Sequence, residues 1–360
     1  MEPNFYTALQ GYETNRTFFT YFSEFRSSEQ ILIVTIETIV LVLVFLISLL
    51  TNVCMMALII KGKKLINFQC LVLNLFLADI VFVAVIPIII VVRWTESWTL
   101  GAYTCRTLLY VMATSGEVTI ITVAAISIER STSILNLRLK APLHCKLVTA
   151  VVLLVWLFSA ITSLPLCIYF QVKTIQVKNQ DYQICTLVWP NTVHEISWDV
   201  TYGLLIFIIP GLIIVISYTK ILKITKATRE RLQASRLCSA HQQQIRVSRQ
   251  DYWLFRTLLL LMISFFIMWT PISLSIFLIL AHNCGKDLFL TSTLFFWICT
   301  FTLTNSAVNP ILYGATQFKG EWRQMLCFYH MKSSGTTAQE HSLPKVRTQV
   351  SQTAPSVICN

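Results

Sequence analysis

The chain has 360 residues, of which 55% are hydrophobic and only 12% are charged, and its mean hydropathy is +0.65. These values lie far from those of soluble domains, so we expect lipid to surround most of the chain. The net charge of +11 falls mainly in short segments between apolar runs and in the tail. This distribution indicates membrane topology, and we predict no nucleic-acid partner.

Seven apolar runs are long enough to cross about 30 Å of hydrocarbon as helices. We therefore predict an all-α fold, a seven-transmembrane helix bundle, with the two termini on opposite sides of the membrane. The sequence shows no internal repeat of the transporter kind. The predicted spans are residues 32–60, 67–92, 105–133, 147–170, 199–225, 254–281 and 292–314.

Basic residues follow the first, third and fifth runs, for example Lys63, Arg138 and Lys220. Because positive charge in short loops stays cytoplasmic, we predict a multi-pass protein of the plasma membrane with its amino terminus outside. Asn15 begins the sequence Asn-Arg-Thr on that outer side. It is therefore a candidate for N-glycosylation.

The predicted domains are an extracellular segment of residues 1–31, a membrane domain of residues 32–316, an amphipathic helix of residues 317–328 and a cytoplasmic tail of residues 329–360. The amphipathic helix is predicted because Phe318, Trp322 and Leu326 recur at helical spacing. Cys327 at its end is a candidate palmitoylation site. The tail has few large apolar residues and is predicted to be disordered. Its candidate phosphorylation sites are Ser333, Ser334, Thr336 and Thr337.

Several polar side chains fall at membrane depth, where each one is costly unless it is paired or faces water. Glu37 in the first span can pair with Arg93 or with a ligand hydroxyl, whereas Glu117 in the third span has no evident partner in the sequence. The residues predicted at one similar depth, where they can share waters or a sodium ion, are Asn52, Asp79, Asn305 and Asn309.

Short motifs stand in a fixed order along the predicted spans. They are Leu-Ala-Asp in the second, Ile-Glu-Arg-Ser at the end of the third, Trp-Thr-Pro in the sixth and Asn-Pro-Ile-Leu-Tyr in the seventh. Together they resemble the rhodopsin-like family of G-protein-coupled receptors over all the spans. The resemblance implies a receptor with no cofactor, and the spans carry no acid pair or Ser-His arrangement typical of an enzyme. The residues implied to form the conformational switch are Asn52, Asp79, Glu129, Arg130, Pro210, Tyr218, Phe265, Trp269, Pro271, Asn305, Asn309, Pro310 and Tyr313.

The resemblance also implies roles for individual residues. Asp79 is implied to hold a sodium ion that favours the resting state, and Glu129 with Arg130 is implied to form a latch that opens on activation. The alternative for that pair is a snorkelling interfacial contact, and prolines are common in membrane helices whatever their role. Cys105 and Cys185 both fall on the oxidising side, and a disulfide between them is implied.

Residues near the predicted outer mouth bear on the ligand. Met112 occupies the position at which amine receptors of this family carry an Asp, which argues against an amine. Arg93 above an apolar cavity suits an amphiphile with a carboxylate head and a hydrocarbon tail. The alternative for Arg93 is a surface charge paired with Glu96. For the nearby aromatic residues, the alternative is the interfacial belt of membrane proteins.

Longer stretches, among them Glu-Ile-Ser-Trp-Asp-Val and Leu-Met-Ile-Ser-Phe-Phe-Ile-Met-Trp, are similar to receptors for long-chain fatty acids within this family. This resemblance runs from residue 30 to residue 328 and implies four partners, namely an unsaturated long-chain fatty acid, a Gq-type G protein, arrestin and membrane lipids. Ile206 and Ala113 depart from the pattern of that group, so polar ligand contacts are not implied there. The residues implied to line the pocket are Arg93, Trp98, Met112, Trp198, Tyr202, Trp269, Phe295, Phe296 and Thr302.

Two other kinds of function stay open from the sequence. A receptor for another anionic lipid or for a small peptide also suits a basic mouth, although the outer loops are short. A lipid transporter needs an apolar cavity as well, but the odd number of spans and the missing repeats argue against it.

Overall fold

The computed structural model describes residues 18–24, 31–61, 67–135, 145–177, 180–234, 241–283 and 290–317. All of them belong to the first of two compact units, residues 1–317. The predicted amphipathic helix, apart from Gln317, and the predicted tail fall outside the described residues. So do these predicted sites: Asn15, Cys327, Ser333, Ser334, Thr336 and Thr337.

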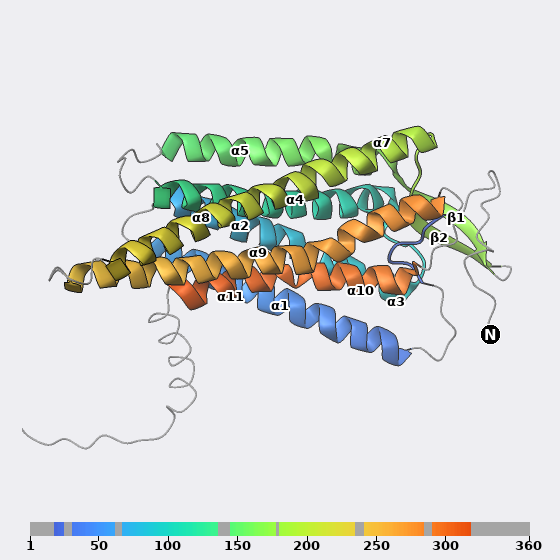
Figure 1. Cartoon of the computed structure of the whole chain (residues 1–360). Coiled ribbons are helices and arrows are strands. Elements are labelled where there is room, and N and C mark those ends of the chain that lie inside the picture. The colour runs from blue at the N-terminus through green and yellow to red at the C-terminus, as the bar shows by residue number, and fades with distance from the viewer. Residues whose placement is uncertain are drawn as a thin grey trace, which may run out of the picture. The chain divides into compact units, whose positions relative to one another are not determined.

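Long helices lie side by side in a bundle, and a two-stranded hairpin stands at one end of it (Figure 1). The elements in chain order are α1 (Ile31–Lys61), α2 (Asn67–Val83), α3 (Ile86–Thr95), α4 (Gly101–Leu135), α5 (Cys145–Thr162), α6 (Leu164–Tyr169), β1 (Phe170–Val177), β2 (Gln180–Leu187), α7 (Thr192–Tyr202), the π-helix η3 (Gly203–Ile208), α8 (Ile209–Ala234), α9 (His241–Asn283), α10 (Ser292–Leu303) and α11 (Asn305–Gln317).

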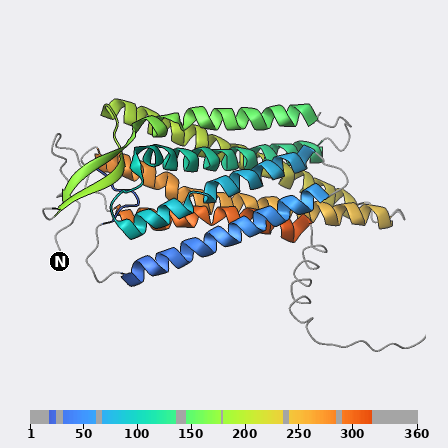
Figure 2. The same cartoon turned by 180° about the vertical axis from the view of Figure 1, so that it is seen from behind.

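Helix α4 lies inside the bundle, in contact with α2, α5 and α8, and most of its middle is buried. The helices α1 and α5 lie at opposite edges in both views of the bundle (Figures 1 and 2). They expose large apolar side chains, such as Leu43 on α1 and Leu153 on α5. Exposed apolar rows on helices with internally satisfied backbones are what a lipid environment requires.

Six helical segments among the described residues are long and apolar enough to cross a membrane. They correspond to the first six predicted runs. The seventh run forms two shorter helices, α10 and α11, of 12 and 13 residues. A turn at Thr304 separates them, although its N–H still donates to the Thr300 and Phe301 carbonyls. The seventh span therefore stays a prediction.

Several of the predicted spans are interrupted where the sequence carries proline. Pro87 stands in the first turn of α3 and Pro165 in the first turn of α6, each after a short break in the helix. The π-helix η3 ends two residues before Pro210. Proline cannot donate the regular hydrogen bond, so the preceding turn widens. By contrast, α9 runs through Pro271 and α11 through Pro310.

The hairpin of β1 and β2 covers the end of the bundle that carries the start of α4. Its strands pair antiparallel, with Phe170 opposite Leu187 and Val172 opposite Cys185. Cys185 forms the predicted disulfide with Cys105 in the first turns of α4, with 5.6 Å between the two Cα atoms. The disulfide therefore holds the second strand against the bundle.

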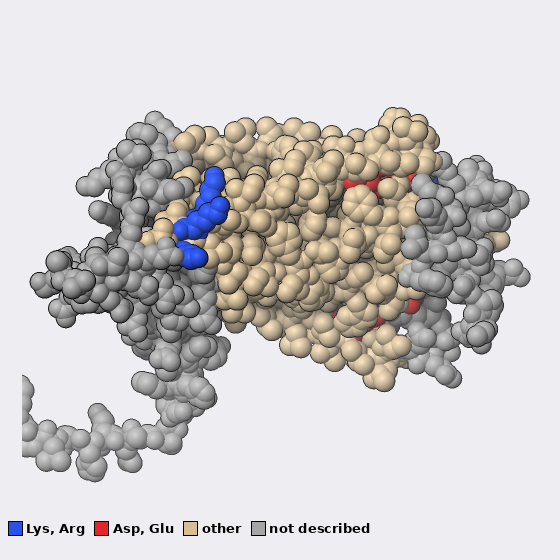
Figure 3. Space-filling view, in the orientation of Figure 1, with Lys and Arg blue, Asp and Glu red and all other residues tan. Residues whose placement is uncertain are grey.

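Charged side chains are distributed unevenly over the face drawn in Figure 3. The described Lys and Arg side chains gather over one end, and the described Asp and Glu side chains lie towards the other. The broad belt between them carries neither kind of charge on this face. Such a belt is what the hydrocarbon layer of a membrane demands.

Candidate functional site

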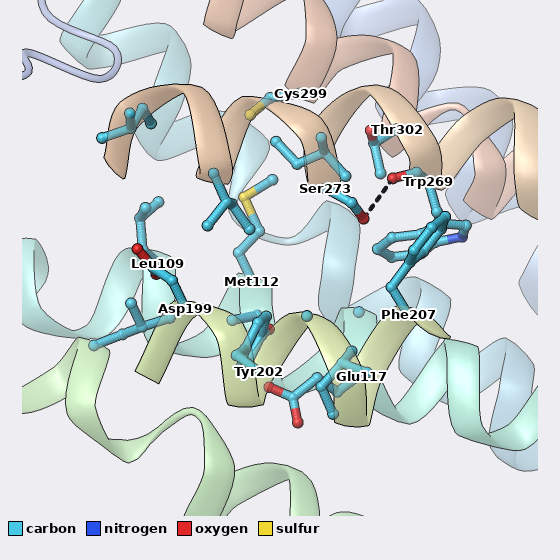
Figure 4. Close-up of a pocket in the computed structure, with 18 of the residues that line it drawn as sticks. Leu109, Met112, Glu117, Asp199, Tyr202, Phe207, Trp269, Ser273, Cys299 and Thr302 are labelled. Carbon is cyan, nitrogen blue, oxygen red and sulfur yellow. Dashed lines mark hydrogen bonds between the residues drawn. The ribbon is translucent and has the colours of Figure 1, made fainter. Parts of the chain in front are cut away.

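A cavity lies among α4, η3, α9 and α10 (Figure 4). Its walls are formed mainly by aliphatic and aromatic side chains, with few polar groups. Trp269 and Phe207 lie at one end of the view, and Leu109 and Asp199 lie near the other. A concave apolar site with a few polar groups is the usual form of a small-molecule binding pocket.

Trp269 forms the deep end of the cavity. Its ring stacks on Phe82 at 5.6 Å between centroids, and it also lies against Gly116. A Cβ atom at Gly116 would lie 3.0 Å from the Trp269 ring, so the missing side chain makes room for the indole. Phe207 beside it stacks on Phe265 at 5.7 Å. Because Trp269 and Phe265 both belong to α9, a displacement of side chains at this end of the cavity would act directly on that helix.

Residues 18–24, which we call the strap, cap the end of the cavity nearer the hairpin, where Tyr21 packs on Phe170. The rings of Phe19, Tyr21 and Phe22 all contact Phe295, with centroids 5.4–5.6 Å apart. Tyr21 lines the cavity itself and has a positive φ of 49°. Burial, and to a smaller extent the nearby Asp199 and Glu195 carboxylates, raise the pKa of the Tyr21 phenol far above its ordinary value. The phenol therefore stays neutral.

Hydrogen bonds outside the ring cluster also fix the strap to the bundle, and one of them runs from the Thr293 hydroxyl of α10 to Glu24. The hydroxyl groups of Thr20 and Ser292 bond to each other, and Thr186 donates to the Phe19 carbonyl over 2.9 Å. The strap is thereby tied both to the start of α10 and to strand β2.

Arg93 holds the strap through a buried cluster of charges. Its guanidinium donates from Nε and Nη2 to the two Glu37 oxygens, over 2.9 and 2.8 Å. It also donates to Glu24 over 2.6 Å and to the Phe22 carbonyl over 3.0 Å, and it lies over the Phe296 ring at 4.6 Å. Arg93 is only 3% exposed. It is therefore not a surface charge paired with Glu96, the alternative that the sequence allowed.

The structure brings together most of the residues that were predicted to line the pocket. Those that line the cavity are Met112, Trp198, Tyr202, Trp269, Phe295 and Thr302. Arg93, Trp98 and Phe296 do not line it. Trp98 is buried near the strap and donates to the Gly101 carbonyl over 2.8 Å. The part each of the nine plays towards a ligand stays a prediction.

Other residues that sequence reasoning missed also line the cavity, and four of them show why they were missed. Glu195 and Asp199 are four residues apart on α7, so they share one helix face, and this spacing was a usable signal. Gly116 is detectable only once the position of Trp269 is known. Tyr21 has no sequence signal, because the strap shows no periodic pattern.

Three of the four polar residues predicted at one depth, Asn52, Asp79 and Asn309, make hydrogen bonds between the helices α1, α2, α4 and α11. The Asp79 carboxylate accepts hydrogen bonds from Asn309 over 2.9 Å and from Thr119 over 3.2 Å. Asn52 donates to the Ser306 carbonyl over 2.8 Å, and its own Oδ1 is buried with no hydrogen-bond partner among the described residues. An unused buried oxygen fits a water or a sodium ion here, and the ion stays a prediction.

The other predicted switch residues occupy separate places in the bundle. Arg130 Nε lies 3.6 Å from a Glu129 carboxylate oxygen at the end of α4, and Tyr313 packs against Phe76. Asn305 is buried at the start of α11, and Tyr218 on α8 is half-buried. Their roles in signalling stay predictions.

We expect Arg93→Gln to lower the free energy of unfolding by about 3–5 kcal/mol, because Glu37 would keep its buried charge without a cation. The double variant Glu37→Gln with Arg93→Gln removes both charges and should regain most of that loss. Thermal unfolding of the purified protein in detergent measures both effects. A single variant as stable as the wild type would contradict the role of Arg93 as a buried clamp.

Comparison with known proteins adds evidence independent of the cavity. The model of the family "7 transmembrane receptor (rhodopsin family)" matches residues 51–313. The chain is 48% identical to Free fatty acid receptor 4 of Rattus norvegicus and to that of Mus musculus, over 92% of this chain and 92% of each relative. It is 26% identical to Somatostatin receptor type 5 of Rattus norvegicus, over 74% of this chain and 70% of the relative.

The family match covers well over half of the chain, and it includes the helices that surround the cavity. These relatives are receptors rather than enzymes. The six apolar spans among the described residues agree with a multi-pass membrane protein. The chain belongs to the rhodopsin family of 7 transmembrane receptors.

Proposed function

We propose that this protein is a receptor for free long-chain fatty acids that signals through a Gq-type G protein and arrestin. The observation that carries the proposal is the cavity, whose walls are mainly aromatic and aliphatic from Leu109 down to Trp269. The 48% identity to Free fatty acid receptor 4 supports the ligand class. The proposal includes a seventh span formed by α10 and α11, and an amino terminus outside the cell.

The hydrocarbon tail accounts for most of the surface that the cavity would bury. Removing an eighteen-carbon tail from water is worth roughly 14 kcal/mol at about 0.8 kcal/mol per methylene group. The tail gains nearly the same free energy when it enters the bilayer. Removal from water therefore does not favour the receptor cavity over the membrane. Selectivity in the proposal therefore comes from the shape of the cavity and from its aromatic faces.

The carboxylate head needs a cationic or hydrogen-bonding partner. Among the described residues that line the cavity there is no Lys, Arg or His. In the proposal, the tail fills the cavity while the head reaches the strap, where it replaces Glu24 on the Arg93 guanidinium. The Glu24 side chain is about a quarter exposed, whereas Glu37 is fully buried, so Glu24 is the partner that a ligand can displace.

Signalling in this proposal begins at the deep end of the cavity. A tail that presses on Trp269 and on the Phe207–Phe265 stack favours an outward swing of α9 about Pro271. That swing opens a cleft beside Arg130 at the inner end of α4. A ligand shifts such an equilibrium only by its difference in affinity for the two states, so contact with Trp269 must differ between them.

Two alternatives have less support. A peptide receptor would need an open outer mouth, whereas the strap fills it with buried rings of Phe19, Tyr21 and Phe22. A lipid transporter would show fatty-acid flux in proteoliposomes, which a receptor does not produce.

Glu24→Gln tests where the carboxylate binds. If the head group replaces Glu24, removing that competing charge should increase the potency of a fatty acid roughly tenfold, the worth of one charge-assisted hydrogen bond. The potency of its methyl ester should stay unchanged. Calcium release and arrestin recruitment in cells, with albumin-buffered ligands, provide the measurement. An equal change for acid and ester would show that Glu24 only braces the strap.

Trp269→Leu tests the signalling step. We expect the maximal response to fall by more than half while fatty-acid affinity changes by less than about threefold, because Trp269 senses the tail rather than holding it. Trp297→Leu is the matched control, since Trp297 faces outward from α10 and is 37% exposed. A loss of affinity with an unchanged maximal response in Trp269→Leu would exclude this mechanism.

A further inference from the structure

Glu117 is a buried carboxylate that no step of the proposed signalling uses. It lies in the middle of α4, is 1% exposed and lines the cavity. Thr162 donates a hydrogen bond to it over 2.5 Å, Ser163 donates another, and the Tyr202 phenol adds a third polar interaction. A carboxylate is costly to bury unless such donors surround it. The cost of burying Glu117 therefore suggests that the carboxylate has a function.

The two hydroxyl donors come from the break between α5 and α6. The helix stops at Thr162 and restarts before Pro165, whose ring cannot continue the regular hydrogen bonding. The break also leaves the Thr162 carbonyl available, and the Trp198 indole N–H donates to it over 3.2 Å. The break between α5 and α6, which we call the joint, thus supplies hydrogen-bond partners to Glu117 of α4 and to Trp198 of α7.

Trp198 and Tyr202 form a flat aromatic wall one turn long. Their rings stack with centroids 4.5 Å apart and an angle of 24°. Trp189 supports Trp198 from behind at 5.5 Å, and Tyr169 supports Trp189 at 4.7 Å. Only the front pair lines the cavity. In Figure 4, Tyr202 and Glu117 lie together on the side opposite Cys299 and Thr302.

The polar groups of both rings, the Trp198 indole N–H and the Tyr202 hydroxyl, are therefore fixed through the break between α5 and α6. The indole of Trp198 is held by the Thr162 carbonyl, and the phenol of Tyr202 is held by Glu117. Glu117 is in turn held by Thr162 and Ser163. The Ser163 side chain also hydrogen-bonds the Tyr202 phenol. Without the carboxylate, the Tyr202 ring would keep its stacking partner and Ser163 but lose the buried acceptor that helps to fix its angle.

We propose that Glu117 is a positioning residue that fixes the wall of Trp198 and Tyr202, and that it thereby sets how sharply the cavity distinguishes bent unsaturated chains from straight saturated ones. This inference rests on the proposed fatty-acid function. A rigid wall accepts only chains that follow its outline and that place double bonds on the ring faces. A loose wall adapts to either chain, so the difference between the two shrinks.

The test compares the potency of an eighteen-carbon polyunsaturated acid with that of its saturated counterpart. Glu117→Gln keeps the size of the side chain but replaces one acceptor oxygen by a donor. We expect the ratio of the two potencies to fall roughly three- to tenfold, the effect of losing one hydrogen bond. Tyr202→Phe keeps the stacked ring and removes the hydroxyl, so it should lower the ratio as well.

Tyr110→Phe is the matched control. Tyr110 lies on the same helix as Glu117 and donates to the Ala160 carbonyl of α5, and it does not line the cavity. We expect this variant to keep the wild-type ratio. If Glu117→Gln reaches the cell surface normally and lowers both potencies equally, the residue has only a structural role and the proposal is overturned.

A ligand-free measurement separates this proposal from the fatty-acid function. In protein labelled with fluorotryptophan, Trp198→Phe identifies the Trp198 resonance. We expect that resonance to broaden or shift in Glu117→Gln and to stay unchanged in Tyr110→Phe. If the wild type responds to no fatty acid, the proposed function and the proposed chain selectivity are both wrong. An unchanged Trp198 resonance in Glu117→Gln would overturn the positioning role by itself.

Discussion

The buried ion pair between Arg93 and Glu37 is the interaction on which the hairpin end of the molecule depends. A charge in this environment persists only when it is paired, so the pair requires α1 and α3 to stay in contact. The remaining donors of the guanidinium then have fixed directions, and they capture Glu24 and the Phe22 carbonyl. The strap, and with it the roof of the cavity, is therefore positioned by a contact within the membrane domain.

Breaks in regular helices shape the cavity as much as the helices do. The joint before Pro165 supplies the partners of the aromatic wall, and the widened turn of η3 before Pro210 carries Ile206 and Phe207 along the cavity. In a regular helix, the backbone N–H and C=O groups bond to one another and leave none for a neighbouring element. Where a helix is interrupted within the membrane, the freed backbone groups must bond to other parts of the protein. The polar network around the cavity is a consequence of this requirement.

The sequence predicted some features and missed others for physical reasons. The long apolar runs predicted α1 and α4 to within a few residues, because lipid demands such runs. Asn52 and Asp79, which were predicted at one depth, each hydrogen-bond to a residue of α11. The strap was not predictable, because its contacts join residues far apart in the chain, such as Glu24 and Arg93. The turn at Thr304 was missed because no proline or glycine marks it.

Gly116 has a consequence for anyone who wishes to stabilise this receptor for structural work. Alanine in place of a helical glycine ordinarily stabilises a helix by about 1 kcal/mol, so statistical design would choose this position first. The added methyl group would press on the indole of Trp269 from 3.0 Å and compete with the packing of the deep cavity. A protein engineered in that way would gain helix propensity and lose the shape of its ligand chamber, so the position should be left as glycine.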